Sequence, residues 1–221
     1  MKLRTLFLST IIIASLAVIT NAQTTDFKAA LKRGDALVVQ EKHALAITEY
    51  STITENAGEL YARAIYNIGV CYYELWQTGE AIRFYEKAIE LRKGNYPRAS
   101  YSLGVAFEDQ GNRAAARAAY EQSIKASQRQ FGPAIYRLAL LEAQAGEPAK
   151  AAALFREAAS REGAHVPASH NNLGVMLTRL GLFKEAEEQF ATALRKSDGA
   201  LADAARNLNL CRSLTATLSR R

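Results

Sequence analysis

Few residues in this chain combine the residue type and the spacing that catalysis or metal binding requires. His165 and His170 lie five residues apart, but two imidazoles alone do not fill a tetrahedral metal site, and no Cys, Asp or Glu stands at a ligand-like spacing from them. The sequence contains no Ser, His and Asp set, no glycine-rich phosphate loop after a strand, and no carboxylate pair set apart from ordinary helix-surface glutamates. We therefore expect a protein that is not an enzyme, with no catalytic residue, no cofactor and no metal.

The two cysteines, Cys71 and Cys211, are also predicted to carry no chemistry. They occupy the same position of the repeat described below, four units apart. At about 8 to 10 Å for each step between packed helices, they would lie far beyond the roughly 7 Å between Cα atoms that a disulfide spans. The other residues in this column are Ala36, Ala106, Leu141 and Met176. Each cysteine is therefore predicted to be a buried thiol that packs as a small apolar residue, with no disulfide.

The elements that position every side chain come from a 35-residue repeat. Four positions of the repeat hold one kind of residue in all five units. They are small at Gly34, Gly69, Gly104, Ala139 and Gly174; alanine at Ala46, Ala81, Ala116, Ala151 and Ala186; aromatic at Tyr50, Tyr85, Tyr120, Phe155 and Phe190; and mostly small at Ile53, Ala88, Ser123, Ala158 and Ala193. A fixed period of this length is typical of helical repeat proteins.

The pattern within each unit predicts two helices folded back on each other. Small residues allow two helices to approach closely, and the aromatic side chain, four residues after an alanine, fills the space between them. Pro97, Pro133 and Pro167 stand where a first helix should begin and Pro148 where a second helix should begin, which suits a residue that lacks an N–H. The glycines expected in the turns between the two helices are Gly79, Gly111, Gly146 and Gly181.

From about Phe27 to Leu201 the sequence resembles the tetratricopeptide repeat family, and together with the leader described below it resembles an exported bacterial member of that family. The resemblance is carried by stretches such as Tyr66-Asn67-Ile68-Gly69, Tyr85-Glu86-Lys87-Ala88 and Asn171-Asn172-Leu173-Gly174. It implies an all-α, right-handed solenoid of five helix-turn-helix repeats with a C-terminal capping helix. The period is one residue longer than the family's usual 34, and Ala139 replaces a glycine. The Sel1-like class, which has longer units, is the alternative architecture.

These expectations divide the chain into a leader at 1–22 and a solenoid at 23–221. The repeats are expected at 27–61, 62–96, 97–131, 132–166 and 167–201, with a capping helix at 202–219. In that last helix one apolar stripe, with a polar outer side, is predicted to cover the end of the stack; the stripe consists of Leu201, Ala205, Leu208, Cys211, Leu214 and Leu218. Arg220 and Arg221 would place positive charge at its C-terminus.

The candidate binding surface is the inner face, which the first helices of the units line in this family. Its predicted residues fall into an aromatic column, an amide column, a basic pair and an apolar floor; they are Tyr66, Tyr101 and Tyr136; Asn67, Asn172 and Asn207; Arg63 and Arg98; and Val70, Val105, Leu140 and Val175. The resemblance implies that Asn67 and Asn172 hold the backbone of a bound peptide. Packing and helix bonding are the alternative roles for these Tyr and Asn side chains. Capture of a C-terminal carboxylate is not expected, because Leu31 and Asp35 replace its Lys and Asn.

The first 22 residues read as a secretory signal. Lys2 and Arg4 precede an uncharged, largely apolar stretch from Leu6 to Thr20, which is shorter than the roughly 20 residues of a membrane-spanning helix. Cleavage is expected after Ala22, leaving Gln23 as the first residue; an uncleaved anchor is the alternative. Without Lys2 and Arg4, 26 Lys and Arg remain against 22 Asp and Glu, a net charge of +4. These basic residues are scattered among glutamates, which argues against nucleic acid as a partner.

The sequence therefore predicts a periplasmic or secreted scaffold that binds a partner protein or an extended peptide segment in its groove, with an acidic or aromatic segment suited to the lining. Membrane attachment is expected only if the signal is uncleaved. The alternative function is an accessory subunit of an envelope enzyme, pilus or secretion complex that has no peptide groove.

Overall fold

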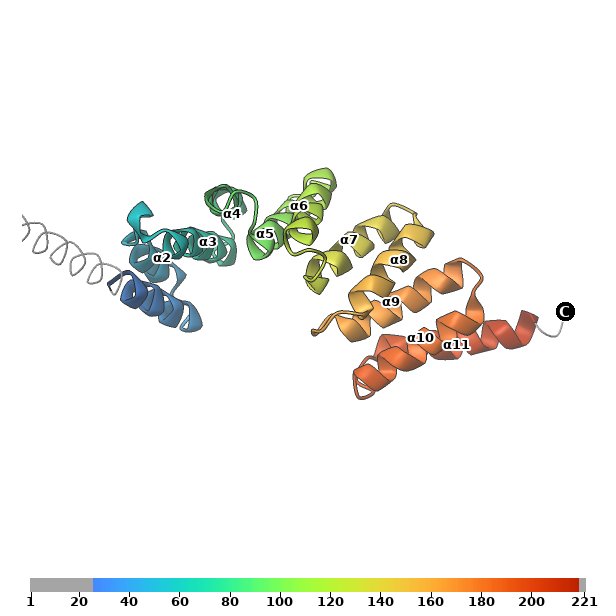
Figure 1. Ribbon diagram of the computed structural model, residues 1–221. Helices are drawn as coiled ribbons and strands as arrows, with labels where there is room; N and C mark the ends of the chain where they lie inside the picture. The colour runs from blue at the N-terminus through green and yellow to red at the C-terminus, as the bar shows by residue number, and fades with distance from the viewer. Residues whose placement is uncertain (1–25, 219–221) are drawn as a thin grey trace, which may run out of the picture. The chain divides into compact units, whose positions relative to one another are not determined.

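The computed structural model describes residues 26–218, and within this range every regular element is a helix (Figure 1). A helix over residues 26–39 comes first. The following elements are α2 (His43–Ser51), the short 3₁₀ helix η1 (Glu55–Ala57), α3 (Glu59–Glu74), α4 (Thr78–Leu91), α5 (Pro97–Asp109), α6 (Arg113–Ala126), α7 (Gly132–Gln144), α8 (Pro148–Ala159), α9 (Val166–Arg179), α10 (Phe183–Lys196) and α11 (Ala202–Leu218). The expected leader, its cleavage site, Arg220 and Arg221 lie outside the described residues.

The chain forms two compact units that divide between Lys93 and Gly94. Unit 1 contains the helix over 26–39 and α2 to α4, and unit 2 contains α5 to α11. Within each unit, helices that follow one another in sequence pack together as predicted for helix pairs. No helix within residues 26–218 combines the length and the apolar character needed to cross a bilayer.

The small and aromatic columns meet inside each pair, as the repeat predicts. A Cβ atom placed on Gly104 would lie 2.4 Å from Cε1 of Tyr120, and one placed on Gly174 would lie 2.6 Å from Cε1 of Phe190. The rings therefore occupy the space that a larger residue would need. The alanine and aromatic columns are buried in every unit, with at most 2% of each side chain exposed. Only the fourth pair has a methyl group at this position, where Ala139 packs in the same cluster as Phe155.

The turn predictions are confirmed at three of four positions. Gly111, Gly146 and Gly181 have positive φ angles of 72°, 79° and 76° between the paired helices. Gly79 was wrongly predicted as a turn residue, because it lies inside α4. The left-handed residue of that turn is Trp76, with φ of 60°, one period before Gly111. The four prolines stand at the first or second position of α5, α7, α8 and α9, as predicted.

The capping helix α11 packs against α10 and α9, but only part of its predicted stripe is covered. Leu208 and Cys211 are buried, whereas Leu214 is 39% and Leu218 51% exposed. The last turns of α11 extend beyond its neighbours (Figure 1), so within residues 26–218 these two leucines stay partly uncovered. The outer side of α11 is largely polar, with exposed Asp203, Arg206, Asn209 and Arg212, but it also carries Leu210, which is 61% exposed.

Candidate partner-binding surface

The predicted tyrosine column packs against the second helices. In unit 2, the Tyr101 ring lies 5.9 Å from Tyr120 and 5.4 Å from Phe131, measured between ring centroids, and Tyr136 lies 5.7 Å from Phe155. In unit 1, Tyr66 lies 5.8 Å from Tyr85. All three column tyrosines are partly exposed. They therefore stabilise the pairs and still present one edge to the surface.

The amides of unit 2 form a directed chain of hydrogen bonds that links three first helices. Asn207 of α11 donates from Nδ2 to Oδ1 of Asn171 over 3.0 Å, and Asn171 of α9 donates to Oδ1 of Asn172 over 3.2 Å. Asn172 in turn donates to the hydroxyl oxygen of Tyr136 on α7 over 3.2 Å. A hydroxyl that accepts a hydrogen bond still has its own hydrogen to donate. The Tyr136 hydroxyl can therefore still donate its hydrogen.

The apolar floor of unit 2 runs past these amides and continues into the cap. Val105, Leu140 and Val175 are partly buried, and all three pack against the core clusters of unit 2. Leu210 follows Val175 by one period of 35 residues and is 61% exposed. Leu210 was not among the predicted residues, because α11 was expected only to pack against the stack, although the 35-residue spacing was a signal. We call the surface that these side chains form on α5, α7, α9 and α11 the first-helix face of unit 2.

Two arginines lie along this face. Arg98 is exposed at the start of α5. Arg137 of α7, which the sequence analysis did not name, lies 3.6 Å from Glu108 and is partly buried. Burial lowers the pKa of Arg137, but its hydrogen bond to Tyr101 and its electrostatic interactions with Tyr101, Tyr120 and Glu108 together outweigh this effect, so the pKa is raised. The face therefore carries a permanent positive charge beside its tyrosines.

In unit 1 the structure groups the predicted residues around Asp35. The Tyr50 hydroxyl and Asn67 Nδ2 donate to Oδ1 of Asp35 over 2.8 and 3.1 Å, and Arg63 donates to Oδ2 over 2.7 Å. Asp35, Val38, Tyr50, Asn67 and Val70 line a pocket of about 250 Å³. Burial, reinforced by Asp35, raises the pKa of the Tyr50 phenol, so that it remains a donor. Asn67 is thus bound to a carboxylate, whereas Asn172 and Asn207 belong to the amide chain.

The histidines and cysteines are placed in local packing sites. His165 contacts the backbone oxygen of Ala158 at 3.0 Å, and His170 contacts the side chain of Gln189 at 2.8 Å. Within residues 26–218 no three His, Cys, Asp or Glu side chains are grouped as a metal site would require. Cys71 is buried in unit 1 and Cys211 in unit 2, and each is a free thiol.

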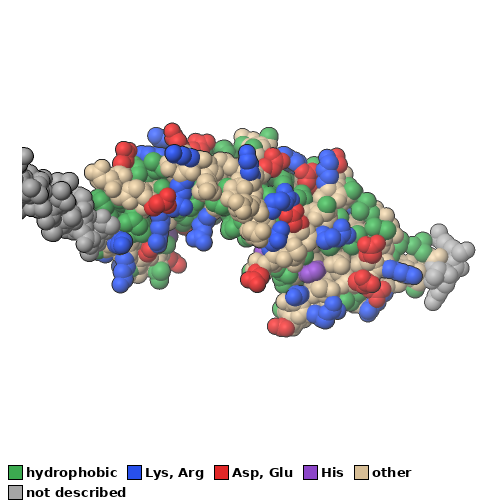
Figure 2. Space-filling view, viewed as in Figure 1, with side chains coloured by type: hydrophobic (Ala, Val, Ile, Leu, Met, Phe, Trp, Pro, Cys, Tyr) green, Lys and Arg blue, Asp and Glu red, His purple; other side chains and the backbone are tan. Residues whose placement is uncertain are grey.

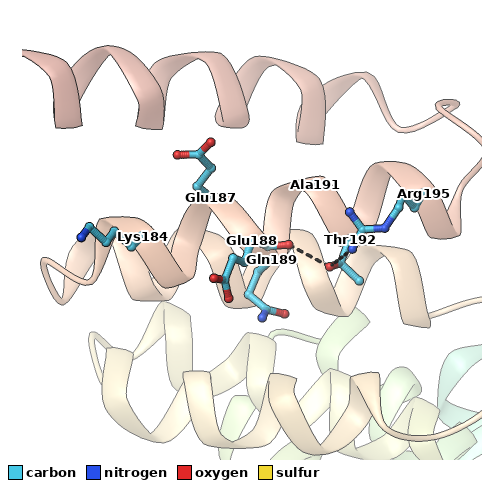
Figure 3. A pocket seen from close by; sticks show the side chains of 7 residues that line it. All are labelled: Lys184, Glu187, Glu188, Gln189, Ala191, Thr192 and Arg195. Atoms are coloured by element: carbon cyan, nitrogen blue, oxygen red, sulfur yellow. Dashed lines mark hydrogen bonds between the residues drawn. The ribbon is translucent and has the colours of Figure 1, made fainter.

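A hollow in unit 2 is open and polar. It has a volume of about 580 Å³ and lies along α10 (Figure 3). Its side chains pair with one another and with α11: Arg195 donates to Thr192 over 2.8 Å, and Glu187 accepts from Arg212 over 2.7 Å. Basic and acidic side chains are likewise interspersed on the visible surface (Figure 2).

Family models identify the repeats. Models described as tetratricopeptide repeat match residues 62–95, 97–130 and 136–207, which together exceed half of the chain. This chain is a tetratricopeptide repeat protein. Comparison with curated proteins gives no match.

Solved structures with the same fold as this tetratricopeptide repeat protein are distant in sequence. A crystal structure of MamA protein is 22% identical, with a TM-score of 0.63, over 78% of this chain and 92% of that one. MamA from Desulfovibrio magneticus RS-1, residue 41 to its end, is 18% identical, with a TM-score of 0.61, over 80% and 97%. TTC0263, a thermophilic tetratricopeptide repeat protein of Thermus thermophilus, is 19% identical, with a TM-score of 0.56, over 83% and 97%. At these identities the likeness concerns the fold.

Proposed function

We propose that this protein is a non-enzymatic scaffold of the cell envelope that binds an extended segment of a partner protein on the first-helix face of unit 2. Tetratricopeptide repeats are protein-interaction modules, which supports the general class. The observation that carries the specific proposal is the apolar floor that ends in exposed Leu210 beside the amide chain. An extended peptide needs both apolar contact for its side chains and fixed polar groups for its backbone.

The polar part of this surface is already ordered. The chain from Asn207 to Tyr136 fixes the amides before any partner arrives, which lowers the entropy lost on binding. The hydroxyl of Tyr136 can donate its hydrogen to a peptide carbonyl or a carboxylate. The guanidinium of Arg137 favours an acidic segment electrostatically. The proposal of an envelope location rests on the sequence of the leader.

The experiment begins with a peptide array probed with the chain from Gln23 to Arg221. For a peptide found in this way, Leu210→Ala should weaken binding by about 1 to 2 kcal/mol, because an exposed side chain loses contact only with the partner. The matched control is Leu182→Ala, which removes another leucine, 43% exposed, from the turn before α10. Tyr101→Ala is less informative, because that ring also packs on Tyr120 and Phe131.

Equal affinities for Leu210→Ala, Leu182→Ala and the unaltered chain would place the peptide elsewhere. If no peptide binds and the protein is recovered only within a larger complex that survives Leu210→Ala, the accessory-subunit alternative replaces the groove.

A further inference from the structure

The Asp35 pocket of unit 1 has a composition distinct from the first-helix face of unit 2. Of the described residues that line it, Asp35 is the one that carries a charge. Val38, Val70 and the ring of Tyr50 supply apolar walls. Arg63 pairs with Asp35 but is not among the lining residues, so it approaches the carboxylate from outside the pocket.

The carboxylate is fixed in position before any ligand arrives. Two neutral donors from different helices hold its Oδ1 atom, Tyr50 from α2 and Asn67 from α3, while Asp35 itself lies on the helix over 26–39. About 40% of the Asp35 side chain remains exposed. A carboxylate held in this way binds a cation without first having to be ordered.

We propose that this pocket binds the side chain of a lysine or arginine of a partner protein. The methylene stem of such a residue packs on apolar walls while its charged head pairs with a carboxylate. A site that captures a C-terminal carboxylate carries positive charge and has an Asn at the position of Asp35. The negative charge of Asp35 suits a cation instead. The ion pair with Arg63 does not block the cation, because half of the Arg63 side chain is exposed and exposed pairs contribute little.

This inference extends the proposed function to a second contact with stated chemistry. The pocket lies in unit 1, and its test uses no segment bound to unit 2. A negative result with the Asp35 variants therefore does not affect the proposal for Leu210, and a negative result with the Leu210 variant does not affect the proposal for Asp35.

The experiment measures binding of the capped tripeptides acetyl-Ala-Lys-Ala-amide and acetyl-Ala-Arg-Ala-amide to the chain from Gln23 to Arg221. NMR signals of the Val38 and Val70 methyl groups report occupancy of the pocket, and those of Val175 serve as the control in unit 2. The corresponding Gln and Glu peptides should bind at least about tenfold more weakly, since a charged hydrogen bond is lost. Asp35→Asn keeps the shape of the side chain and should also cost about tenfold or more. Glu86→Gln, which removes an exposed carboxylate of α4 outside the pocket, should leave the affinity unchanged.

A second variant keeps the proposal testable even if Asp35→Asn disturbs folding. Arg63→Gln removes the competing cation and should tighten binding of the Lys peptide by roughly twofold to fivefold at low salt. The proposal is overturned if the Gln or Glu peptide binds as well as the Lys peptide, if folded Asp35→Asn retains the affinity, or if Arg63→Gln weakens binding. It is equally overturned if the Lys peptide shifts the Val175 methyl groups and leaves those of Val38 and Val70 unchanged.

Discussion

Replacing Gly104 by alanine tests the packing that defines each repeat. The added Cβ would lie 2.4, 2.6 and 2.9 Å from three ring atoms of Tyr120. The ring would have to retreat by roughly 1 Å to restore ordinary contact. Tyr120 is fully buried and its hydroxyl bonds to Glu108, so movement of the ring also disturbs that hydrogen bond.

The magnitude follows from two opposing effects. Overpacking a buried site costs about 1 to 3 kcal/mol, and a site enclosed by a rigid ring lies toward the upper end. Alanine in a helix interior is favoured over glycine by about 1 kcal/mol. We therefore expect Gly104→Ala to lower the free energy of unfolding by about 1 to 2 kcal/mol, measured by urea denaturation followed by circular dichroism.

The control is Gly79→Ala, another glycine within a helix, where the added Cβ would meet no atom within 4 Å. This variant should gain up to about 1 kcal/mol. In a double-mutant cycle, the cost of Gly104→Ala should shrink when Tyr120 is replaced by leucine, because the two residues are in contact. The packing argument fails if Gly104→Ala is as stable as Gly79→Ala, or if the cycle shows no coupling.

Three further predictions concern Trp76, Cys71 and the leader. Trp76→Gly should raise the free energy of unfolding by about 1 kcal/mol, because Trp76 has φ of 60° and is 92% exposed; equal or lower stability in urea would contradict this strain. Burial raises the pKa of the Cys71 thiol to about 11. The stability that the protonated thiol contributes should be complete below the unfolded pKa of about 8.5 and lost as pH rises toward 11. Cys71→Ala should abolish this pH dependence of the free energy of unfolding. Denatured protein should contain two free thiols. The intact mass from the envelope fraction should correspond to a chain that begins at Gln23, and a mass that includes residues 1–22 would indicate an anchored protein.

Residue spacing alone predicted most of the fold. The columns of Gly104, Ala116 and Tyr120 identified which residues face each other within a pair, since helical periodicity places residues at fixed spacings on one face. The turn residue Trp76 was missed, because tryptophan carries no preference for the left-handed conformation that glycine signals at Gly111. The position in the repeat, and not the residue type, determined the backbone there.

The binding surface was predicted less completely. The sequence placed Tyr101 and Tyr136 in one column, but it did not decide between packing and binding. The structure shows that both rings pack on second helices. Arg137 was missed, because its contacts with Tyr101 and Glu108 depend on neighbouring helices. Leu210 was missed although its 35-residue spacing from Val175 was a signal in the sequence.

The sequence by itself determined the repeat, its helix pairs and the small and aromatic residues at their contacts, because these follow from local periodicity and side-chain size. Only the tertiary structure decided which polar groups are bonded. Asn207 reaches Asn171 and Asn172 reaches Tyr136 across 36 residues, and Asp35 gathers donors 15 to 32 residues away. Hydrogen bonds depend on distance and direction between separate helices. The same reason explains why part of the predicted stripe of α11 is exposed: a sequence pattern shows which face is apolar, but only neighbouring helices determine whether that face is covered.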